Sequence, residues 1–281
     1  MKLKNYLKRM VKYVLYDYKQ PIIYANVSEM SYEKLHSNKV YLITGGSSGI
    51  GYEIAHSLIK SGAKVIITGR DEKKLETAQK KLGSDRCDYI IMDISDAKNS
   101  AETLQKIFFK YKKIDGLINN AGISLHEKDF QTVTIDTFDK QFNTNLKGSY
   151  FLTQEYIKLC LNYKQKDSSI LFISSERGSM CDYLPYGLTK VCINSLVQAL
   201  SRKYYKKGFR INSIGPGVTC SPLVNKEKDD DLYLENAAGR YLLPEEISNV
   251  ACFLLSDLAS SVSGEIINCD AGNHIRKYFE E

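Results

Sequence analysis

The sequence lacks any long hydrophobic run, and this absence narrows the classes of protein that it can encode. It contains no stretch of about 18 apolar residues, which a membrane-spanning helix would need. Its N-terminus also lacks the apolar run of roughly 7 to 15 residues that is typical of a secretory signal peptide. We therefore expect a cytoplasmic protein with no transmembrane segment.

Cysteine and histidine occur without the spacing of a metal site. The seven cysteines are odd in number and scattered, with no C-x-x-C pair, and the four histidines form no cluster at metal-ligand spacing. Such usage favours reduced, mostly buried thiols over disulfides or zinc ligands. The sequence thus predicts no metal site, and reduced cysteines agree with a cytoplasmic location.

An excess of one charge sign is confined to the start of the chain. Of the 39 basic residues, six lie in residues 1–20 against a single acid, Asp17, and the remaining chain is nearly neutral. A near-neutral body argues against nucleic acid as a partner. Residues 3–18 place apolar side chains three or four positions apart, so we expect residues 1–38 to be a basic amphipathic extension. It either packs on the body or a neighbouring subunit, or makes a peripheral contact with an anionic membrane surface.

From residue 39 to residue 281, short β-rich runs alternate with longer helical patterns. The β-rich runs are apolar on both faces, as in a parallel sheet that helices cover on both sides. We therefore expect one α/β domain with a Rossmann-type, doubly wound sheet of seven parallel strands. The predicted strands are 39–44, 64–68, 88–92, 115–119, 169–174, 210–214 and 264–268, and the predicted helices are 50–60, 71–82, 97–111, 136–162, 186–206 and 244–256.

The run TGGSSGIG at residues 44–51 joins the first predicted strand to the following helix. Backbone N–H groups and the positive end of a helix can bind a pyrophosphate at such a turn. Gly45 would permit the sharp turn, Gly49 the close approach of phosphate, and Gly51 tight contact between helix and strand. Taken alone, the motif is also compatible with a plain strand-to-helix turn.

The end of the second predicted strand bears on the choice of dinucleotide. Arg70 stands where an acidic residue would bind a ribose 2′-hydroxyl, and a guanidinium suits a 2′-phosphate. We therefore expect NADP(H), with NAD(H) as the alternative. Asp71 follows directly and has an alternative role as the N-cap of the next helix.

The run YGLTK at residues 186–190 offers acid–base chemistry. A tyrosine and a lysine four positions apart share one face of a helix. Because a phenol ordinarily has a pKa near 10, tyrosine can exchange protons near neutrality only if a cation stabilises the phenolate. Lys190 can supply that cation for Tyr186, although such a pair considered by itself is also common on exposed helix surfaces.

In combination, the motifs resemble the short-chain dehydrogenase/reductase family, and the likeness covers residues 39–273. The motifs follow the order of that family: TGGSSGIG (44–51), Asp93 after the third strand, NNAG (119–122), NLKG (145–148), ISS (173–175), YGLTK (186–190) and PGVT (216–219). The resemblance implies an oxidoreductase that interconverts a carbonyl and a secondary alcohol by hydride transfer.

The resemblance also implies a catalytic tetrad of Asn145, Ser175, Tyr186 and Lys190. Tyr186 would donate a proton to the substrate carbonyl oxygen and take it back in the oxidative direction. Ser175, preferred over Ser174 because the family places the active hydroxyl second, would hydrogen-bond the same oxygen. Lys190 would lower the pKa of Tyr186 and bind the nicotinamide ribose, and Asn145 would hold a water that links Lys190 to solvent.

The cofactor site implied by the resemblance is built mainly from backbone groups that follow the strands. Its predicted members are Gly45, Ser47, Ser48, Gly49, Ile50, Gly51, Arg70, Asp93, Ile94, Asn119, Ala121, Gly122, Tyr186, Lys190, Pro216, Gly217, Val218 and Thr219.

The substrate pocket is expected to involve residues 124–126, 176–183 and 219–243. The polarity of ERGSMCDY at 176–183 favours a small polar carbonyl substrate over a large lipid. The charged run KEKDDD at 226–231 is either a solvated loop or a lid over the substrate.

The resemblance further implies a homotetramer or homodimer, with helices 136–162 and 186–206 packed across a twofold interface. A dinucleotide-binding sensor or scaffold without turnover is the alternative function, and the intact tetrad argues against it.

Overall fold

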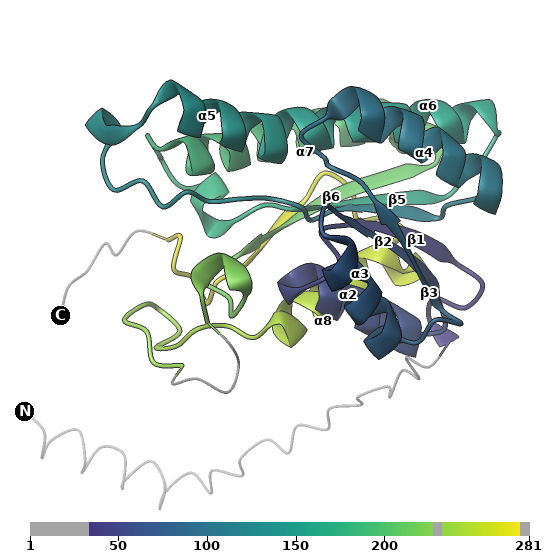
Figure 1. Cartoon of the computed structure of the whole chain (residues 1–281), viewed down its shortest axis with the longest axis horizontal. Coiled ribbons are helices and arrows are strands. Elements are labelled where there is room, and N and C mark those ends of the chain that lie inside the picture. Colours follow the sequence, from purple (N-terminus) through teal and green to yellow (C-terminus); the bar gives the residue numbers. More distant parts are fainter. Residues whose placement is uncertain (1–33, 227–231, 276–281) are drawn as a thin grey trace, which may run out of the picture. The chain divides into compact units, whose positions relative to one another are not determined.

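Seven strands form one parallel sheet in the computed structural model, which describes residues 34–226 and 232–275 (Figure 1). The strand order is β3-β2-β1-β4-β5-β6-β7. The strands are β1 (Val40–Thr44), β2 (Lys64–Gly69), β3 (Cys87–Ile91), β4 (Gly116–Asn119), β5 (Ser168–Ile173), β6 (Phe209–Pro216) and β7 (Ile266–Cys269). The predicted seven-stranded, doubly wound fold is confirmed. Most of the predicted N-terminal extension (1–33) and of the charged run (227–231) lies outside the described residues.

Helices cover both faces of the sheet, with α4, α5, α6 and α7 on one side and α2, α3 and α8 on the other (Figure 1). They are α2 (Gly49–Lys60), α3 (Glu72–Leu82), α4 (Ala97–Tyr111), α5 (Ile135–Gln141), α6 (Ser149–Asn162), α7 (Pro185–Tyr204) and α8 (Pro244–Leu255). The helix predicted at 136–162 is divided, because a π-helical segment, η3 (Phe142–Gly148), separates α5 from α6. In the described part of the chain, no helix is both long and apolar enough to cross a membrane.

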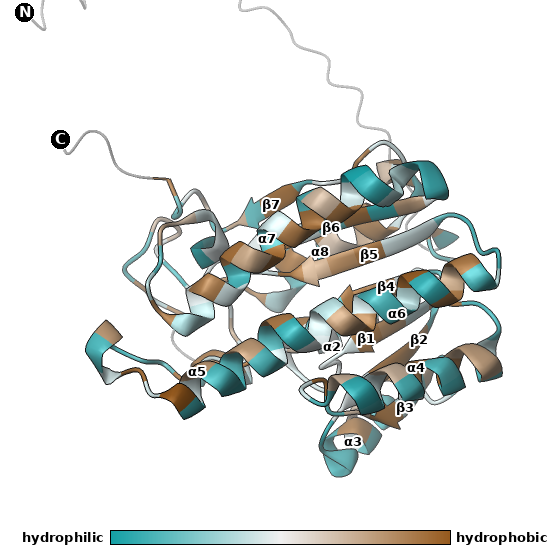
Figure 2. Cartoon of the chain, turned by 90° about the horizontal axis from the view of Figure 1, so that it is seen from above, coloured by the Kyte–Doolittle hydropathy of each residue, from teal (hydrophilic) through white to brown (hydrophobic). Residues whose placement is uncertain are grey.

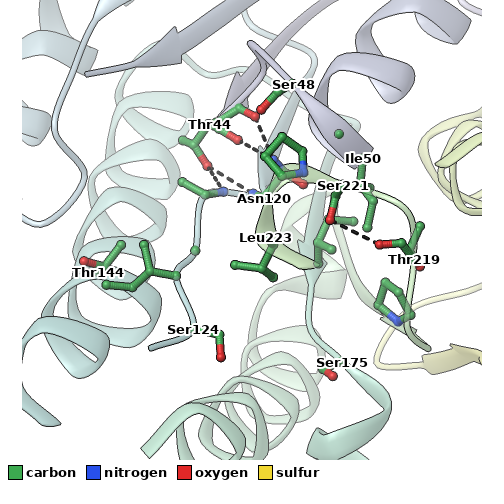
Figure 3. Close-up of a pocket in the computed structure, with 18 of the residues that line it drawn as sticks. Thr44, Ser48, Ile50, Asn120, Ser124, Thr144, Ser175, Thr219, Ser221 and Leu223 are labelled. Atoms are coloured by element: carbon green, nitrogen blue, oxygen red, sulfur yellow. Dashed lines mark hydrogen bonds between the residues drawn. The ribbon is translucent and has the colours of Figure 1, made fainter. Parts of the chain in front are cut away.

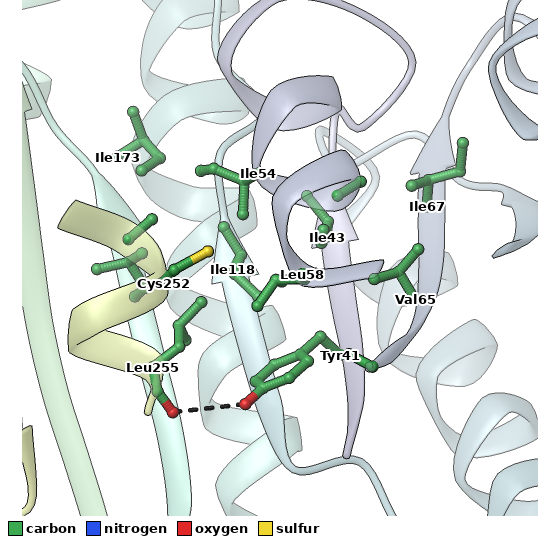
Figure 4. Close-up of a cluster of buried hydrophobic side chains, with 14 of the residues drawn as sticks. Tyr41, Ile43, Ile54, Leu58, Val65, Ile67, Ile118, Ile173, Cys252 and Leu255 are labelled. Carbon is green, nitrogen blue, oxygen red and sulfur yellow. Dashed lines mark hydrogen bonds between the residues drawn. The ribbon is translucent and has the colours of Figure 1, made fainter. Parts of the chain in front are cut away.

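The hydrophobic core consists of two clusters, one on each face of the sheet. Successive side chains of a strand point to opposite faces, so Tyr41 and Ile43 pack with α2 and α8 while Leu42 packs with α4, α6 and α7. Figure 4 shows the first cluster, in which Leu58 of α2 and Leu255 of α8 meet the strands. Seen from above and coloured by hydropathy, the strands are predominantly hydrophobic while the helices above them carry hydrophilic residues as well (Figure 2). Burial on both faces explains why the strands appear in the sequence as unbroken apolar runs.

The order of strands reverses direction at β1, which lies between β2 and β4. In open α/β sheets, ligands bind outside the carboxyl ends of the strands at such a switch point. Here the Thr44 hydroxyl, at the end of β1, accepts hydrogen bonds from the backbone N–H groups of Asn120 and Ala121, each at 3.0 Å. These bonds fix the two strand ends that border the switch point.

Candidate active site

A cavity of about 700 Å³ lies at the carboxyl ends of the strands, within the roughly 300–1,000 Å³ range of small-molecule sites. Figure 3 shows residues from several elements around it, among them Ser48 at the start of α2, Asn120 after β4 and Ser175 after β5. Most residues of the predicted site line this cavity: Gly45, Ser47, Ser48, Gly49, Ile50, Arg70, Asp93, Ile94, Ala121, Gly122, Ser175, Tyr186, Lys190, Pro216, Gly217, Val218 and Thr219. The fold therefore brings together residues that are far apart in the sequence.

Three predicted site residues, Gly51, Asn119 and Asn145, are not among the residues that line the cavity. Gly51 lies so close to the side chain of Asn120 that a Cβ at this position would clash with Nδ2 of Asn120. The side chain of Asn119 is buried on the α6 side of the sheet and donates to the Thr153 hydroxyl at 2.9 Å. Its neighbour Asn120 lines the cavity instead, and the sequence prediction missed it.

The glycine-rich turn has the geometry of an anion cradle. Gly45 and Gly49 have φ angles of +66° and +55°, which side-chain-bearing residues rarely adopt. A Cβ at Gly45 would also lie 3.0 Å from the Cα of Ala121. The N-cap of α2, Ser48, makes no side-chain capping bond, so the first N–H groups of the helix lack a side-chain acceptor. A pyrophosphate fits this arrangement.

Two cationic side chains stand where the cavity passes the end of β2. Arg70 is exposed and lines the cavity together with Lys74 of α3, which the sequence prediction missed. Asp71 uses its carboxylate as the N-cap of α3, accepting from the backbone N–H of Lys74 at 3.1 Å. The alternative role predicted for Asp71 is thus confirmed, and Asp71 lines this end of the cavity together with the two cations.

Tyr186 and Lys190 occupy the first turns of α7, which begins at Pro185. Proline suits the first helical position because its missing N–H would have no intrahelical partner there. The Lys190 Nζ lies 5.5 Å from the centroid of the Tyr186 ring and donates to the main-chain oxygen of Ile173 at 2.8 Å. Lys190 is only 4% exposed, and burial lowers its pKa to about 8.

The two serines after β5 have different surroundings. The Ser174 hydroxyl donates to the main-chain oxygen of Lys190 at 3.4 Å. Ser175 lies beside Tyr186: burial raises the pKa of the Tyr186 phenol, whereas the Ser175 hydroxyl and the Arg177 guanidinium lower it. Of these two serines, Ser175 is thus the one whose hydroxyl affects the pKa of Tyr186.

Asn145 lies in the π-helical segment η3 and is almost completely buried. Its Oδ1 accepts from the backbone N–H of Ile123 at 2.8 Å, and its Nδ2 donates to the Ile123 carbonyl at 2.9 Å. The Nδ2 also reaches the hydroxyl of Thr189 at 3.3 Å. The side chain thus fixes the segment after β4, and the water-holding role assigned to Asn145 stays a prediction.

Three ionisable residues of the predicted substrate pocket, Glu176, Arg177 and His126, have partners within the protein. Glu176 accepts from the Asn273 amide at 3.0 Å, and the Arg177 Nε donates to the Asp182 carboxylate at 2.5 Å. His126 contacts the main-chain oxygen of Leu223 at 3.0 Å through its Nε2. Within residues 34–226 and 232–275, no cluster of His, Cys, Asp and Glu is placed to hold a metal ion.

Known proteins resemble this chain in both sequence and fold. The family model described as enoyl-(acyl carrier protein) reductase matches residues 45–274. The 3-oxoacyl-(acyl-carrier-protein) reductase FabG of Rickettsia felis is 32% identical over 243 residues, covering 84% of this chain and 97% of that protein. The structure of 3-ketoacyl-(acyl-carrier-protein) reductase from Brucella melitensis complexed with NADH gives a TM-score of 0.77 at 28% identity, covering 85% of this chain and 100% of that one. A short-chain type dehydrogenase/reductase from Mycobacterium ulcerans gives 0.78 at 28% identity, with coverages of 85% and 91%.

Proposed function

The chain belongs to the short-chain dehydrogenase/reductase family, and on this basis we propose that it reduces a 3-oxoacyl thioester with NADPH, with Tyr186 as the proton donor. It is an oxidoreductase that interconverts a carbonyl and an alcohol with a nicotinamide dinucleotide. The observation that supports the finer proposal is the convergence of Ser175, Tyr186 and Lys190 on one cavity beside the glycine-rich turn.

In the proposed mechanism, side chains of this chain handle the proton while the bound nicotinamide supplies the hydride. Tyr186 donates its phenolic proton to the substrate carbonyl oxygen and recovers it in the reverse direction. The Ser175 hydroxyl donates a hydrogen bond to the same oxygen, where negative charge develops. Lys190 places a cation near the ring of Tyr186, and Asn145 holds the segment after β4 in place through Ile123.

The cofactor would be held along the carboxyl edge of the sheet. The turn at residues 45–51 would bind the pyrophosphate through backbone N–H groups. Asp93 and Ile94 would border the adenine, and residues 216–219 the nicotinamide. Arg70 and Lys74 would bind a 2′-phosphate, and this pair of cations is the reason to propose NADPH over NADH.

Replacing Arg70 by alanine is expected to raise the Kd for NADPH about tenfold and to leave the Kd for NADH unchanged. The reason is that a charge-assisted hydrogen bond at a partly exposed site contributes on the order of 1.4 kcal/mol, and only NADPH carries the 2′-phosphate. Isothermal titration calorimetry with both dinucleotides measures the two constants. Lys73→Ala is the matched control, since Lys73 is exposed in α3 but does not line the cavity. Equal weakening of both cofactors would show that Arg70 does not recognise the 2′-phosphate.

The substrate class follows from the relatives and from the partners of the polar residues. The polarity of residues 176–183 predicts a small polar carbonyl substrate. In the structure, however, Glu176 and Arg177 are already bound to Asn273 and Asp182. Their charges therefore give little reason to expect a polar substrate. The similar proteins from Rickettsia felis and Brucella melitensis, in contrast, are named as reductases of 3-oxoacyl or 3-ketoacyl groups. We propose the same substrate class for this chain.

Substrate preference is tested by following NADPH absorbance with two substrates. One is a 3-oxobutanoyl thioester, and the other is a polyhydroxylated ketone of the same chain length. We expect kcat/KM to be at least about tenfold higher for the thioester, a difference of the size that pocket contacts supply. Faster reduction of the polyhydroxylated ketone would instead support the prediction of a small polar substrate. Tight NADPH binding without turnover of either substrate would favour a sensor.

A further inference from the structure

A second cation besides Lys190 lies near the ring of Tyr186. The guanidinium carbon of Arg177 is 5.9 Å from the ring centroid, and the Lys190 Nζ is 5.5 Å from the same point. Arg177 belongs to the short 3₁₀ helix η4 (Glu176–Ser179), and its backbone N–H donates to the Ser175 hydroxyl at 3.3 Å. One segment thus carries both Ser175 and a cation toward the tyrosine.

The position of the Arg177 guanidinium is restrained by the loop before α7. Its Nε donates to Oδ2 of Asp182, a carboxylate that is only 6% exposed. The Oδ1 of the same carboxylate accepts from the backbone N–H of Leu184, immediately before α7. Gly187, next to Tyr186 in the chain, leaves the room for this carboxylate, since a Cβ there would clash with Oδ2 of Asp182. The ion pair is therefore built into the start of the helix that carries Tyr186.

We propose that Arg177 is a positioning residue of the reaction, which acts together with Lys190 to stabilise the phenolate of Tyr186. This inference rests on the proposed role of Tyr186 as proton donor. A cation over an aromatic ring is attracted by its face, and the attraction strengthens when the ring's oxygen becomes negative.

The charges around Tyr186 agree with this role. Burial and the Glu176 carboxylate raise the pKa of the phenol, while Arg177 lowers it. Burial lowers the pKa of Lys190 to about 8, whereas the surroundings of Tyr186 raise the pKa of its phenol above the ordinary value, so Lys190 loses its charge at a lower pH than that at which the phenolate forms. A guanidinium stays protonated throughout that range. Arg177 is thus the cation that persists at alkaline pH.

Replacing Arg177 by methionine is expected to raise the apparent pKa of the acidic limb for alcohol oxidation by about one unit. Oxidation requires the phenolate, and removal of a stabilising cation makes the phenolate form at higher pH. Below that limb kcat/KM falls about tenfold, and above it the variant matches the wild type. The measurement is the pH profile of kcat/KM with NADP⁺ and a 3-hydroxyacyl thioester.

Two further variants separate charge from shape. Arg177→Lys keeps a cation and is expected to restore at least half of the shift. Arg202→Met removes the same charge from the far end of α7, about 24 Å away by helix rise, and is expected to leave the limb in place. An unmoved limb in Arg177→Met, or the same shift in Arg202→Met, overturns the proposal.

A readout without turnover makes the test independent of the proposed function. In protein labelled with ¹³C at the phenolic carbon of tyrosine, the resonance of Tyr186 is assigned by its loss in Tyr186→Phe, and its pH titration gives the pKa directly. We expect that pKa to rise by about one unit in Arg177→Met. If the wild type turns over no substrate, the proposed function fails while this titration still decides the role of Arg177. An unchanged titration overturns that role even in an active enzyme.

Discussion

Replacing Tyr186 by phenylalanine is expected to lower kcat for NADPH-dependent reduction by about a thousandfold, within the range that proton transfer by a positioned side chain contributes. The substitution removes one oxygen atom and keeps the ring that packs at the start of α7. Without the phenol, the oxygen that becomes negative on hydride transfer keeps the hydrogen bond from Ser175 but loses the acid proposed to protonate it. Single-turnover absorbance of NADPH with a 3-oxobutanoyl thioester measures the loss.

Cofactor binding provides the internal control for this variant. Because the phosphate cradle and the two cations near β2 are untouched, the Kd for NADPH is expected to change less than about threefold, as for a residue remote from those contacts. Tyr163→Phe is the matched variant: Tyr163 follows α6, is 46% exposed and does not line the cavity, so its change should leave kcat within about twofold of the wild type. Activity of Tyr186→Phe above one tenth of the wild type would assign the proton transfer to another group.

The fold and most of the cavity could be predicted because they depend on local sequence patterns. Strands that are buried on both faces carry unbroken apolar runs, and parallel strands bring their carboxyl ends to one edge of the sheet. Residues that closely follow a strand, such as Gly45 and Ser175, therefore line the cavity. The four-residue spacing of Tyr186 and Lys190 likewise suffices to place both on one face of a helix.

Contacts between distant side chains could not be predicted in this way. No local pattern shows that Asn120 reaches the carbonyls of Thr44 and Gly45 at 3.0 Å while the adjacent Asn119 turns toward α6. The pairing of Arg177 with Asp182 depends in the same way on how the loop before α7 folds back. The division of the long helix at η3 has no proline to mark it, so the sequence pattern reads as continuous.

Tertiary contacts of this kind also anchor α8, and Arg210 of β6 is the main example. Its guanidinium donates to four main-chain oxygens at and beyond the end of that helix, and to one hydroxyl of β5. The acceptors are Leu254 O at 2.5 Å, Leu255 O at 3.2 Å, Ser256 O at 2.9 Å, Ala259 O at 3.2 Å and Ser169 Oγ at 2.5 Å. The last carbonyls of a helix have no intrahelical partner, and a cation there also opposes the negative end of the helix dipole.

Replacing Arg210 by methionine is expected to lower the free energy of unfolding by about 3–5 kcal/mol. Methionine fills a similar length of side chain but donates no hydrogen bond, so several partly buried carbonyls lose their partner at once. Urea denaturation followed by circular dichroism measures the loss. Arg210→Lys is expected to lose less, because it keeps the charge but cannot reach all the acceptors from a single nitrogen.

Arg210→Met should lower the stability of the fold without changing cofactor binding or catalytic activity, because Arg210 does not line the cavity. At a temperature where the variant is folded, its Kd for NADPH and its kcat are expected to match the wild type.

Arg86→Met is the comparison, since Arg86 is exposed and donates to a single carbonyl, that of Gly62, at 3.2 Å. Its loss should cost less than about 1 kcal/mol, as is usual for a surface position. Equal losses for Arg86→Met and Arg210→Met would show that the carbonyls at the end of α8 are solvated adequately without the guanidinium, and α8 would then be held by its apolar contacts with α2 and the sheet.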